Sequence, residues 1–489
     1  MDNETLQNEL KKQKHTTKTI YILIFCLLAT FVGFMLGLKI GTPKNEYAHV
    51  TKVLKILEKE WYSEVYYDSY EDAPIAQFIS SVAQLDHEKM LDPYTYLIKR
   101  QPAVVDNTGK MGVKIRNCFN SNYQLVKTVY PNSPAYKAGL QMYDLICGVQ
   151  LKDNTRIFED YSKYLNGEIN DSITLLVSRY PYNLNEFLEI EVTFERFYYP
   201  TAYTYPCDLK DTLYVKLDGF VSNITGKNTV DELDFIFNQN QEKKYLILDL
   251  INNGGGALDS LVQICDLLLP AKKLISSLEI KDKSKTYYKT KTKQKYTFDQ
   301  IFIYMNENTA SASEMLIGWL DYYFDNLVII GNNTYGKGIA QRTINLTPQY
   351  DFQYTFAKWF TPDNQWIQKV GFQPTTNEDK IVENETYSLL SKTWLDSKIN
   401  LEFDQVDVNN LKQIQILLNH LYQQNLREDG YFDINTQNLV VQIQQQNQLE
   451  TNGKIDELFL RILASQYALE ITQFDNQYLN RTKQILEAH

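Results

Sequence analysis

Two short segments contain the residues with the clearest capacity to cleave a bond. Ser311 follows a predicted strand and opens a predicted amphipathic helix, where free backbone N–H groups favour negative charge on a serine oxygen. Lys337 lies between two glycines, which allow tight placement of the backbone and are unusual neighbours for a surface lysine. A neutral lysine amine can take the proton of a serine hydroxyl, so the two residues are a candidate nucleophile and general base.

Each of these residues also has a simpler explanation. For Lys337 to act as a base, its pKa must fall by about 3 from about 10.4, at a cost of roughly 4 kcal/mol, which burial without a carboxylate partner could supply. A phosphate-binding or ion-paired lysine is the alternative, although the Walker spacing is absent. Ser311 could be only a helix N-cap, because Glu314 would complete a capping box, and Ser313 could then be the reactive serine.

Histidine is excluded as the general base of the central region. None of the five histidines lies between residues 88 and 419. A Ser-His-Asp triad or a two-histidine metal site within that region is therefore excluded, and we expect no metal and no other cofactor. The histidines are His15, His49, His87, His420 and His489.

A glycine-rich turn is the third candidate for a chemical role. Residues 249–257 (DLINNGGGA) come directly after a predicted strand, and Gly254, Gly255 and Gly256 free the backbone to point N–H groups at a ligand oxygen. Such donors suit an oxyanion hole, where charge develops on an attacked carbonyl. A tight turn into a helix explains the glycines equally well, so this segment alone identifies no site.

The elements that must position these segments alternate between strands and helices. Apolar runs at residues 245–250, 301–304 and 327–330 predict buried strands, and helical stretches lie between them. The alternation predicts an α/β core with a partly parallel sheet over residues 200–395. The glycine turn, Ser311 and Lys337 each follow one of these strands.

Residues 105–197 are predicted to form a separate β-domain. Ser133 and Pro134 have the positions of an N-cap and a first helical residue, and Gly139 ends this helix. Together with the strand-like residues 144–149, this segment resembles a PDZ domain. The resemblance implies a loop whose N–H groups capture a C-terminal carboxylate while the peptide adds a strand to the sheet edge; a β-domain without a ligand is the alternative. The loop would contain Met111, Gly112 and Val113.

The set of motifs resembles the C-terminal processing peptidases, also called tail-specific proteases. The resemblance covers roughly residues 45–395 and implies an α/β protease core of the crotonase/Clp-like spiral type, which cleaves protein substrates through an acyl-enzyme. The motifs are Asn-Asn-Gly-Gly-Gly (252–256), Ala-Ser-Ala-Ser-Glu (310–314), Tyr-Gly-Lys-Gly-Ile-Ala-Gln (335–341), Asp-Pro-Tyr-Thr (92–95), Trp-Phe-Thr-Pro-Asp (359–363) and Gly-Phe-Gln-Pro (371–374).

The resemblance also implies a role for individual residues. Ser311, in register with Glu314, becomes the nucleophile, Lys337 becomes the base, and Gln341 becomes the residue that orients the lysine. The PDZ domain is implied to bind or gate the C-terminal tails of substrates. The oxyanion hole would consist of the N–H groups of Ala312 and of Gly255 or Gly256.

Three departures from the family pattern leave every catalytic group in place. Thr309 stands where another serine is usual, and Ile251 replaces a common arginine before Asn252. Residues 321–326 make the spacing between Ser311 and Lys337 slightly longer than usual. An insertion in a surface turn is easily absorbed, so we expect the lysine to keep its place.

An apolar run near the N-terminus predicts a membrane anchor. Residues 20–40 are apolar except for Lys39, and as a helix they would span about 30 Å. Four lysines precede the run and predict a cytoplasmic tail over residues 1–19. We therefore expect a single-pass protein of the cell membrane, with its catalytic part extracytoplasmic. A cleaved signal peptide is the alternative, but the run is long and no A-x-A site follows.

Helical regions flank the core on both sides. Residues 45–100 show helical periodicity, with Val50, Leu57 and Trp61 on one face, and together with residues 198–395 they would make up the protease part. Residues 403–472 are helical and Gln-rich, and their Asp-Gly-Tyr-Phe turn (429–432) resembles three-helix peptidoglycan-binding domains. A plain helical bundle is the alternative. A homodimer through the N-terminal helices also remains open.

Composition excludes several other classes of protein. The net charge of −11 and the absence of a basic stripe with interleaved aromatics argue against nucleic-acid binding, and the Lys-rich residues 281–295 read better as a solvated hairpin. The five cysteines are scattered without a CxxC motif, which favours buried free thiols over zinc or a disulfide framework.

Two other functions compete with an active endopeptidase. The first is an inactive, wall-tethered PDZ scaffold or adaptor, which the intact Ser311, Lys337 and Gln341 disfavour. The second is a crotonase-like acyl-transfer enzyme, since oxyanion turns also serve thioesters; the predicted anchor and peptide-binding domain disfavour it. The expected partners are therefore protein or peptide substrates with free C-terminal tails, the membrane and peptidoglycan.

Overall fold

The computed structural model of the chain describes residues 48–62, 77–78, 92–100, 108–120, 122–180, 182, 186–222, 228–382, 385–396 and 398–488. The chain divides into two compact units. The smaller unit contains the described residues up to Trp61, those of the segment 66–100, and residues 343–353. The larger unit contains nearly all of the rest, including every candidate site residue.

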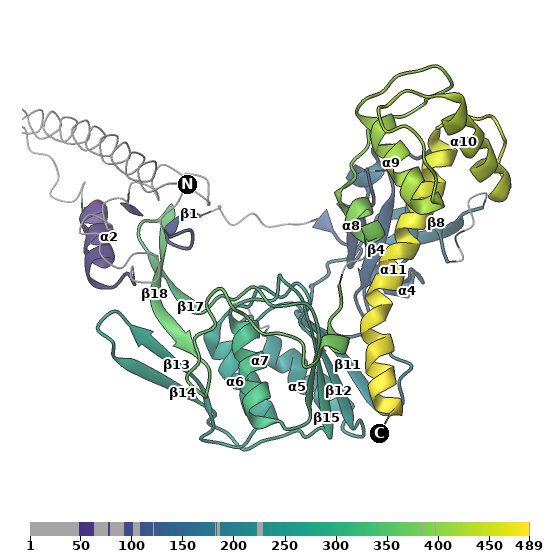
Figure 1. Cartoon of the computed structure of the whole chain (residues 1–489). Helices are drawn as coiled ribbons and strands as arrows, with labels where there is room; N and C mark the ends of the chain where they lie inside the picture. The colour runs from purple at the N-terminus through teal and green to yellow at the C-terminus, as the bar shows by residue number, and fades with distance from the viewer. Residues whose placement is uncertain are drawn as a thin grey trace, which may run out of the picture. The chain divides into compact units, whose positions relative to one another are not determined.

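The core of the larger unit is a five-stranded sheet of order β10-β11-β12-β15-β16 (Figure 1). The strands from β11 to β16 are parallel neighbours, and β10 pairs antiparallel with β11. The three strands predicted from apolar runs are β12, β15 and β16, so these predictions are confirmed. The strands are β10 (Ala202–Thr204), β11 (Thr212–Leu217), β12 (Tyr245–Asp249), β15 (Gln300–Met305) and β16 (Leu327–Gly331).

Side chains alternate between the two faces of this sheet, as the strand period of two requires. Leu246, Leu248 and Ile303 pack with helices α5 (Thr229–Gln239), α6 (Leu258–Leu268) and α7 (Ala312–Tyr323). On the other face, Phe302 and Tyr304 pack with Tyr478 of the C-terminal helix α11 (Glu457–Glu487), so both faces are covered.

A second sheet lies beside the first in the sequence of the larger unit. β13 (Leu274–Ile280) pairs antiparallel with β14 (Lys285–Lys289) and with the second half of β18 (Tyr350–Phe360), and β17 (Ile339–Asn345) also pairs with β18. The Lys-rich segment turns between β13 and β14, which confirms the predicted hairpin.

The β-domain has a six-stranded sheet with the path β3-β4-β5-β8-β9, on which β6 pairs with β5, and β3 is therefore an edge strand. The short helix α4 (Pro134–Lys137) begins as predicted, because Ser133 Oγ accepts the Tyr136 N–H at 3.1 Å. The other elements are β2 (Thr108–Gly109), β3 (Val113–Asn117), β4 (Gln124–Val129), β5 (Leu145–Gln150), β6 (Arg156–Ile157), the 3₁₀ turn η3 (Tyr161–Tyr164), β7 (Gly167–Glu168), β8 (Ser172–Ser178) and β9 (Leu188–Thr193).

The C-terminal region is helical. After the 3₁₀ turn η4 (Asn377–Asp379) come α8 (Glu385–Lys392), α9 (Asn410–Tyr422), α10 (Ile434–Gln446) and α11. The predicted Asp-Gly-Tyr-Phe turn is fixed by Gln415, whose amide accepts the Gly430 N–H at 2.9 Å and donates to Tyr431 O at 2.9 Å. Helix α11 extends to residue 487, well past the predicted end at residue 472.

The smaller unit contains α2 (Ala48–Lys59) and β1 (Tyr96–Lys99), which pairs with the first residues of β18. The predicted turn at residues 92–95 is confirmed, and its Asp92 carboxylate accepts the Trp61 indole N–H at 2.9 Å. Leu57 and Trp61 are buried as expected, but Val50 is 39% exposed, so its assignment to the buried face was wrong.

The prediction of a membrane anchor is corrected. No helix among the residues described here is both long enough and apolar enough to cross a bilayer. The longest of them, α11, has 31 residues, but charged side chains such as Arg461, Asp475 and Lys483 occur along it. The predicted anchor at residues 20–40 lies outside the described residues, and the structure gives no support to a single-pass membrane protein with an extracytoplasmic catalytic part.

The cysteines of the described region are free thiols. Cys118, Cys147 and Cys265 are buried and Cys207 is partly exposed, so the prediction of buried free thiols holds for three of them. Burial raises the pKa of each buried thiol, which makes these groups poor nucleophiles.

Candidate active site

Ser311 occupies a strained turn at the start of α7. Its backbone has φ 60° and ψ −116°, a conformation that costs a non-glycine residue of the order of 1–3 kcal/mol. In hydrolases that carry their serine on a sharp strand-to-helix turn, such strain presents the hydroxyl at the helix N-terminus. Ser311 is partly exposed, and the helix dipole and free N–H groups of α7 lie directly behind it.

Ser313 has a different environment. Its side chain is fully buried, and its hydroxyl donates to Asn253 O at 2.9 Å. This contact connects α7 to the glycine turn and leaves the hydroxyl no access to a substrate. The geometry therefore favours Ser311 over Ser313 as the reactive serine, which the sequence alone left open.

Glu314 connects the serine loop to the lysine loop. Its carboxylate is fully buried and accepts the Ser311 N–H at 2.8 Å, the Gly336 N–H at 2.7 Å and the Lys337 N–H at 2.9 Å. The Thr334 hydroxyl donates to it at 2.6 Å. Burial raises the pKa of Glu314, and the four hydrogen bonds oppose that rise. The residue predicted only to complete a capping box thus fixes the main chain on both sides of the candidate pair.

The backbone of Lys337 is held from the other side by two tryptophans. Lys337 O accepts the Trp359 indole N–H at 2.7 Å, and Gly338 O accepts the Trp366 indole N–H at 2.8 Å. A Cβ at Gly336, which has φ 78°, would lie 2.9 Å from Val370 N. Both glycines are therefore needed for close packing, and Lys337 itself is half-buried.

Gln341 lies on β17, four residues after the lysine. Its side-chain amide is 3.5 Å from Thr355 Oγ1 on the neighbouring strand β18. The pairing of β17 with β18 therefore sets the position of Gln341, whose role in orienting Lys337 remains a prediction.

The glycine turn after β12 lies against the serine. A Cβ built on Gly255, where φ is 100°, would be 2.9 Å from Ser311 Cβ and 2.8 Å from Ala312 N, so only glycine permits this approach. The Gly255 N–H donates to Asn253 Oδ1 at 2.9 Å. Within the described part of the chain, the N–H groups of Ala312 and Gly256 have no acceptor. Of the two predicted glycine donors, Gly256 is therefore the better placed.

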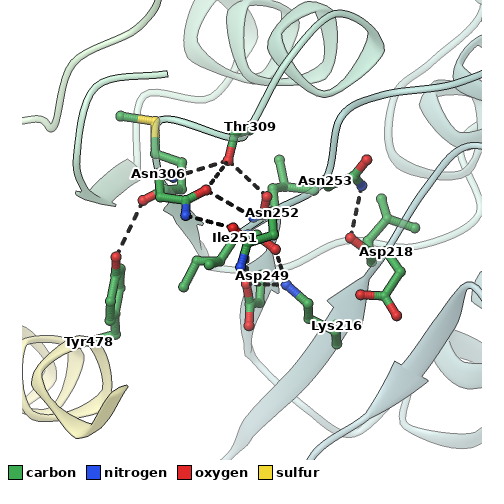
Figure 2. Close-up of polar contacts among 12 residues, drawn as sticks. Lys216, Asp218, Asp249, Ile251, Asn252, Asn253, Asn306, Thr309 and Tyr478 are labelled. Atoms are coloured by element: carbon green, nitrogen blue, oxygen red, sulfur yellow. Dashed lines mark hydrogen bonds and ion pairs between the residues drawn. The ribbon is translucent and has the colours of Figure 1, made fainter. Parts of the chain in front are cut away.

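Asparagine side chains join the glycine turn to the turn before Ser311 (Figure 2). Asn306 Oδ1 accepts the Asn252 N–H, and Asn306 Nδ2 donates to Asn252 Oδ1, both at 2.9 Å. Thr309, one of the departures from the family pattern, donates its hydroxyl to Leu250 O at 2.8 Å and accepts the Asn306 N–H at 3.0 Å. The threonine therefore has a buried structural role.

A buried ion pair lies under the same turn and was missed by the sequence analysis (Figure 2). Lys216 Nζ donates to Asp249 Oδ1 at 2.9 Å and to Ile251 O at 2.5 Å, and Tyr214 also donates to Asp249. Lys216 and Asp249 are register partners on neighbouring parallel strands. A lysine within the apolar run of residues 213–217 was the available signal.

A cavity of about 630 Å³ opens beside the glycine turn at the carboxyl ends of the sheet strands. Its walls come from three sources: the edge strand β3, the loops after β11, β12 and β15, and helix α11. Ligands of parallel sheets characteristically bind at this end. The residues that the argument uses from this lining are Lys114, Arg116, Lys216, Asn252 and Asn306.

The predicted PDZ loop precedes β3. Met111 is buried, and its carbonyl accepts the Ala135 N–H at 2.9 Å. Gly112 has φ 73°, and a Cβ there would lie 2.3 Å from Ser133 Cβ. Of the residues described, none accepts a hydrogen bond from the Met111 or Gly112 N–H. Val113 begins the edge strand. In the same described ranges, no cluster of three or more histidine, cysteine or carboxylate side chains could hold a metal ion.

Comparison with known proteins identifies two regions of the chain. Residues 211–377 match the model of peptidase family S41, and residues 407–463 match that of a peptidoglycan binding domain. Curated relatives include the CtpA-like serine protease of Staphylococcus aureus (strain MRSA252), which is 26% identical over 472 residues and covers 93% of this chain and 89% of the relative. The Staphylococcus epidermidis counterpart is also 26% identical, over 93% of this chain and 92% of the relative.

Among solved structures, an S41 protease from Bacteroides fragilis has a TM-score of 0.50 and 16% identity, covering 76% of this chain and 98% of that one. This likeness concerns the fold alone. All three comparisons place the glycine turn, Ser311 and Lys337 within the region that matches the peptidase model.

Proposed function

Because residues 211–377 of this serine protease form a peptidase family S41 domain, we propose that it is an endopeptidase with Ser311 as nucleophile and Lys337 as general base. One observation carries the proposal: the buried Glu314 carboxylate binds the main-chain N–H groups of both residues at 2.8 and 2.9 Å. A single rigid group thus sets the position of the two loops relative to each other. The strained backbone of Ser311 supports the same assignment.

The proposed reaction proceeds through an acyl-enzyme. Neutral Lys337 accepts the proton of the Ser311 hydroxyl as the oxygen attacks the scissile carbonyl. The N–H groups of Ala312 and Gly256 stabilise the oxyanion, and Lys337 returns the proton to the leaving amine. Water then hydrolyses the ester with Lys337 again as base. Gln341 is proposed to orient the lysine amine.

The β-domain is proposed to be a PDZ domain that binds or gates substrate tails. Its edge strand β3 can accept an additional strand, and the N–H groups of Met111 and Gly112 are suited to a C-terminal carboxylate. Lys114 and Arg116 of β3 line the same cavity as Asn252 of the glycine turn, so a peptide along β3 would run toward the catalytic loops.

The remaining finer assignments are also proposals. The core is proposed to have the crotonase/Clp-like spiral arrangement, which its parallel sheet with helices α5, α6 and α7 supports. The region of residues 407–463 is proposed to hold the enzyme on peptidoglycan, on the basis of its match to that domain type.

The test is cleavage of a denatured protein by the full chain. Ser311→Ala and Lys337→Ala should each lose activity by at least about 10³-fold, as removal of a nucleophile or its base does in other serine proteases. Lys369→Ala, which changes a lysine outside the proposed machinery, is the control. Labelling of Ser311 by a fluorophosphonate separates an active protease from an inactive scaffold. Retention of cleavage by Ser311→Ala would sink the assignment.

A further inference from the structure

The ion pair of Lys216 and Asp249 plays no part in the proposed chemistry, yet it is deeply buried. The residues are 8% and 4% exposed, and removing two charges from water costs several kcal/mol for each ion. A buried pair can often be replaced by neutral side chains without loss of stability. Stability of the sheet therefore does not account for the pair by itself.

The pair holds the first residue of the glycine turn at both of its polar groups. Lys216 Nζ donates to Ile251 O at 2.5 Å, and Asp249 Oδ1 accepts the Ile251 N–H at 2.8 Å. The Ile251 side chain contributes no polar contact of its own. The next residue, Asn252, has φ 61°, so the direction of the turn is determined immediately after this clamp.

The turn is held on its other side by Asn306, whose amide makes two hydrogen bonds with Asn252 at 2.9 Å. The two contacts fix the path of the backbone into Gly255 and Gly256. We propose that Lys216 is a positioning residue for the oxyanion donors: it sets where the Gly256 N–H lies without touching the substrate. This inference rests on the proposed function of Ser311 and the glycine turn.

The test uses the full chain and a fluorogenic peptide taken from a cleavage site of a denatured protein. Lys216→Met should lower kcat by about 10- to 100-fold, the effect expected of a displacement of about 1 Å, with KM within about 3-fold of wild type. Lys216→Arg should recover most of the activity, because a guanidinium can reach both acceptors. A peptide aldehyde, which mimics the tetrahedral intermediate, should bind Lys216→Met more weakly in proportion to the loss in kcat/KM.

Two further variants separate positioning from folding. Lys216→Met/Asp249→Asn leaves no unpaired buried charge, so it should unfold at wild-type urea concentrations and still have the low kcat. Lys114→Met is the matched control, because Lys114 lines the same cavity but forms a half-exposed ion pair with Asp218. It should keep wild-type kcat.

The outcomes divide cleanly. Wild-type kcat in the double variant, or aldehyde binding that does not change with kcat, overturns the positioning role. Failure of Lys216→Arg to recover activity also overturns it. In each case the loss of activity in Ser311→Ala would leave the proposed function intact, whereas an active Ser311→Ala would remove the function and this inference together.

Discussion

The loop that carries Ser311 and the glycine turn that faces it are both fixed by buried polar contacts, but the contacts differ in kind. On the serine side, one carboxylate, that of Glu314, accepts four hydrogen bonds and joins the nucleophile loop to the lysine loop. On the glycine side, an ion pair from β11 and β12 shares the task with neutral amides of Asn253 and Asn306.

This difference predicts different sensitivities to mutation. A single group that serves two loops has no substitute, because each lost acceptor leaves a buried N–H unsatisfied. The glycine turn is held at several independent points, so the loss of one contact should be tolerated better. The two sides also differ in charge, since the serine side depends on an ionisable group that lies between Ser311 and Lys337.

The largest effect should come from Glu314→Gln. The amide NH₂ would face backbone N–H groups that now donate to a carboxylate oxygen, so at least one of the contacts to Ser311, Gly336 or Lys337 is lost. We expect kcat to fall by about 10³-fold and the free energy of unfolding to fall by about 1.5–3 kcal/mol. Peptide hydrolysis and urea denaturation measure the two effects.

The matched control for this variant is Asp379→Asn. Asp379 is also a buried carboxylate that caps a short helical turn, where it accepts the Thr376 N–H at 3.0 Å and pairs with Arg481. Its loss should lower stability without a comparable fall in kcat per folded molecule. Equal losses of activity in both variants would show that burial, and not the connection between the two loops, explains the effect of Glu314.

The next largest effect should come from Gly255→Ala. The new Cβ would meet Ala310 O and Ala312 N at 2.8 Å, so the turn must move away from Ser311. We expect about 10²-fold lower kcat, the scale of losing an oxyanion donor. Gly139→Ala is the control, because Gly139 also has positive φ but has open space around its Cβ. It should cost about 1–2 kcal/mol of stability and leave kcat unchanged.

The pH dependence of stability gives a smaller effect with a definite sign. Burial raises the pKa of Glu314 above its ordinary value of 4.5. The stabilisation linked to its protonated form is therefore fully present below pH 4.5 and is lost as the pH rises through the raised value. Glu314→Gln cannot titrate, so its deficit in unfolding free energy should narrow between about pH 4 and pH 7. A deficit that widens over this range would mean that the folded protein lowers this pKa.

The sequence predicted the elements that carry the site because their signals are local. The apolar runs identified β12, β15 and β16, and Ser133-Pro134 identified the start of α4. The conformation of Ser311 and the closeness of Gly255 to it depend on how two loops meet across the sheet. Nothing in the sequence spacing of these loops states that distance.

The partners that hold the site were also beyond reach of the sequence. Glu314 was visible as a capping residue, but its contacts with Gly336 and Lys337 join segments 22 and 23 residues apart. Lys216 meets Asp249 only because β11 and β12 are parallel neighbours with those residues in register. Long-range register of this kind does not follow from composition or periodicity.

The smallest effect should come from Ser313→Ala, the variant that compares the two serines directly. The lost hydroxyl leaves Asn253 O still bonded to the Ala310 N–H at 3.0 Å, so no buried acceptor is left unsatisfied. We expect a loss of about 0.5–1.5 kcal/mol in unfolding free energy and kcat within about 3-fold of wild type. Fluorophosphonate labelling should be unchanged in Ser313→Ala and absent in Ser311→Ala. The reverse pattern would make Ser313 the nucleophile and would require α7 to shift enough to expose it.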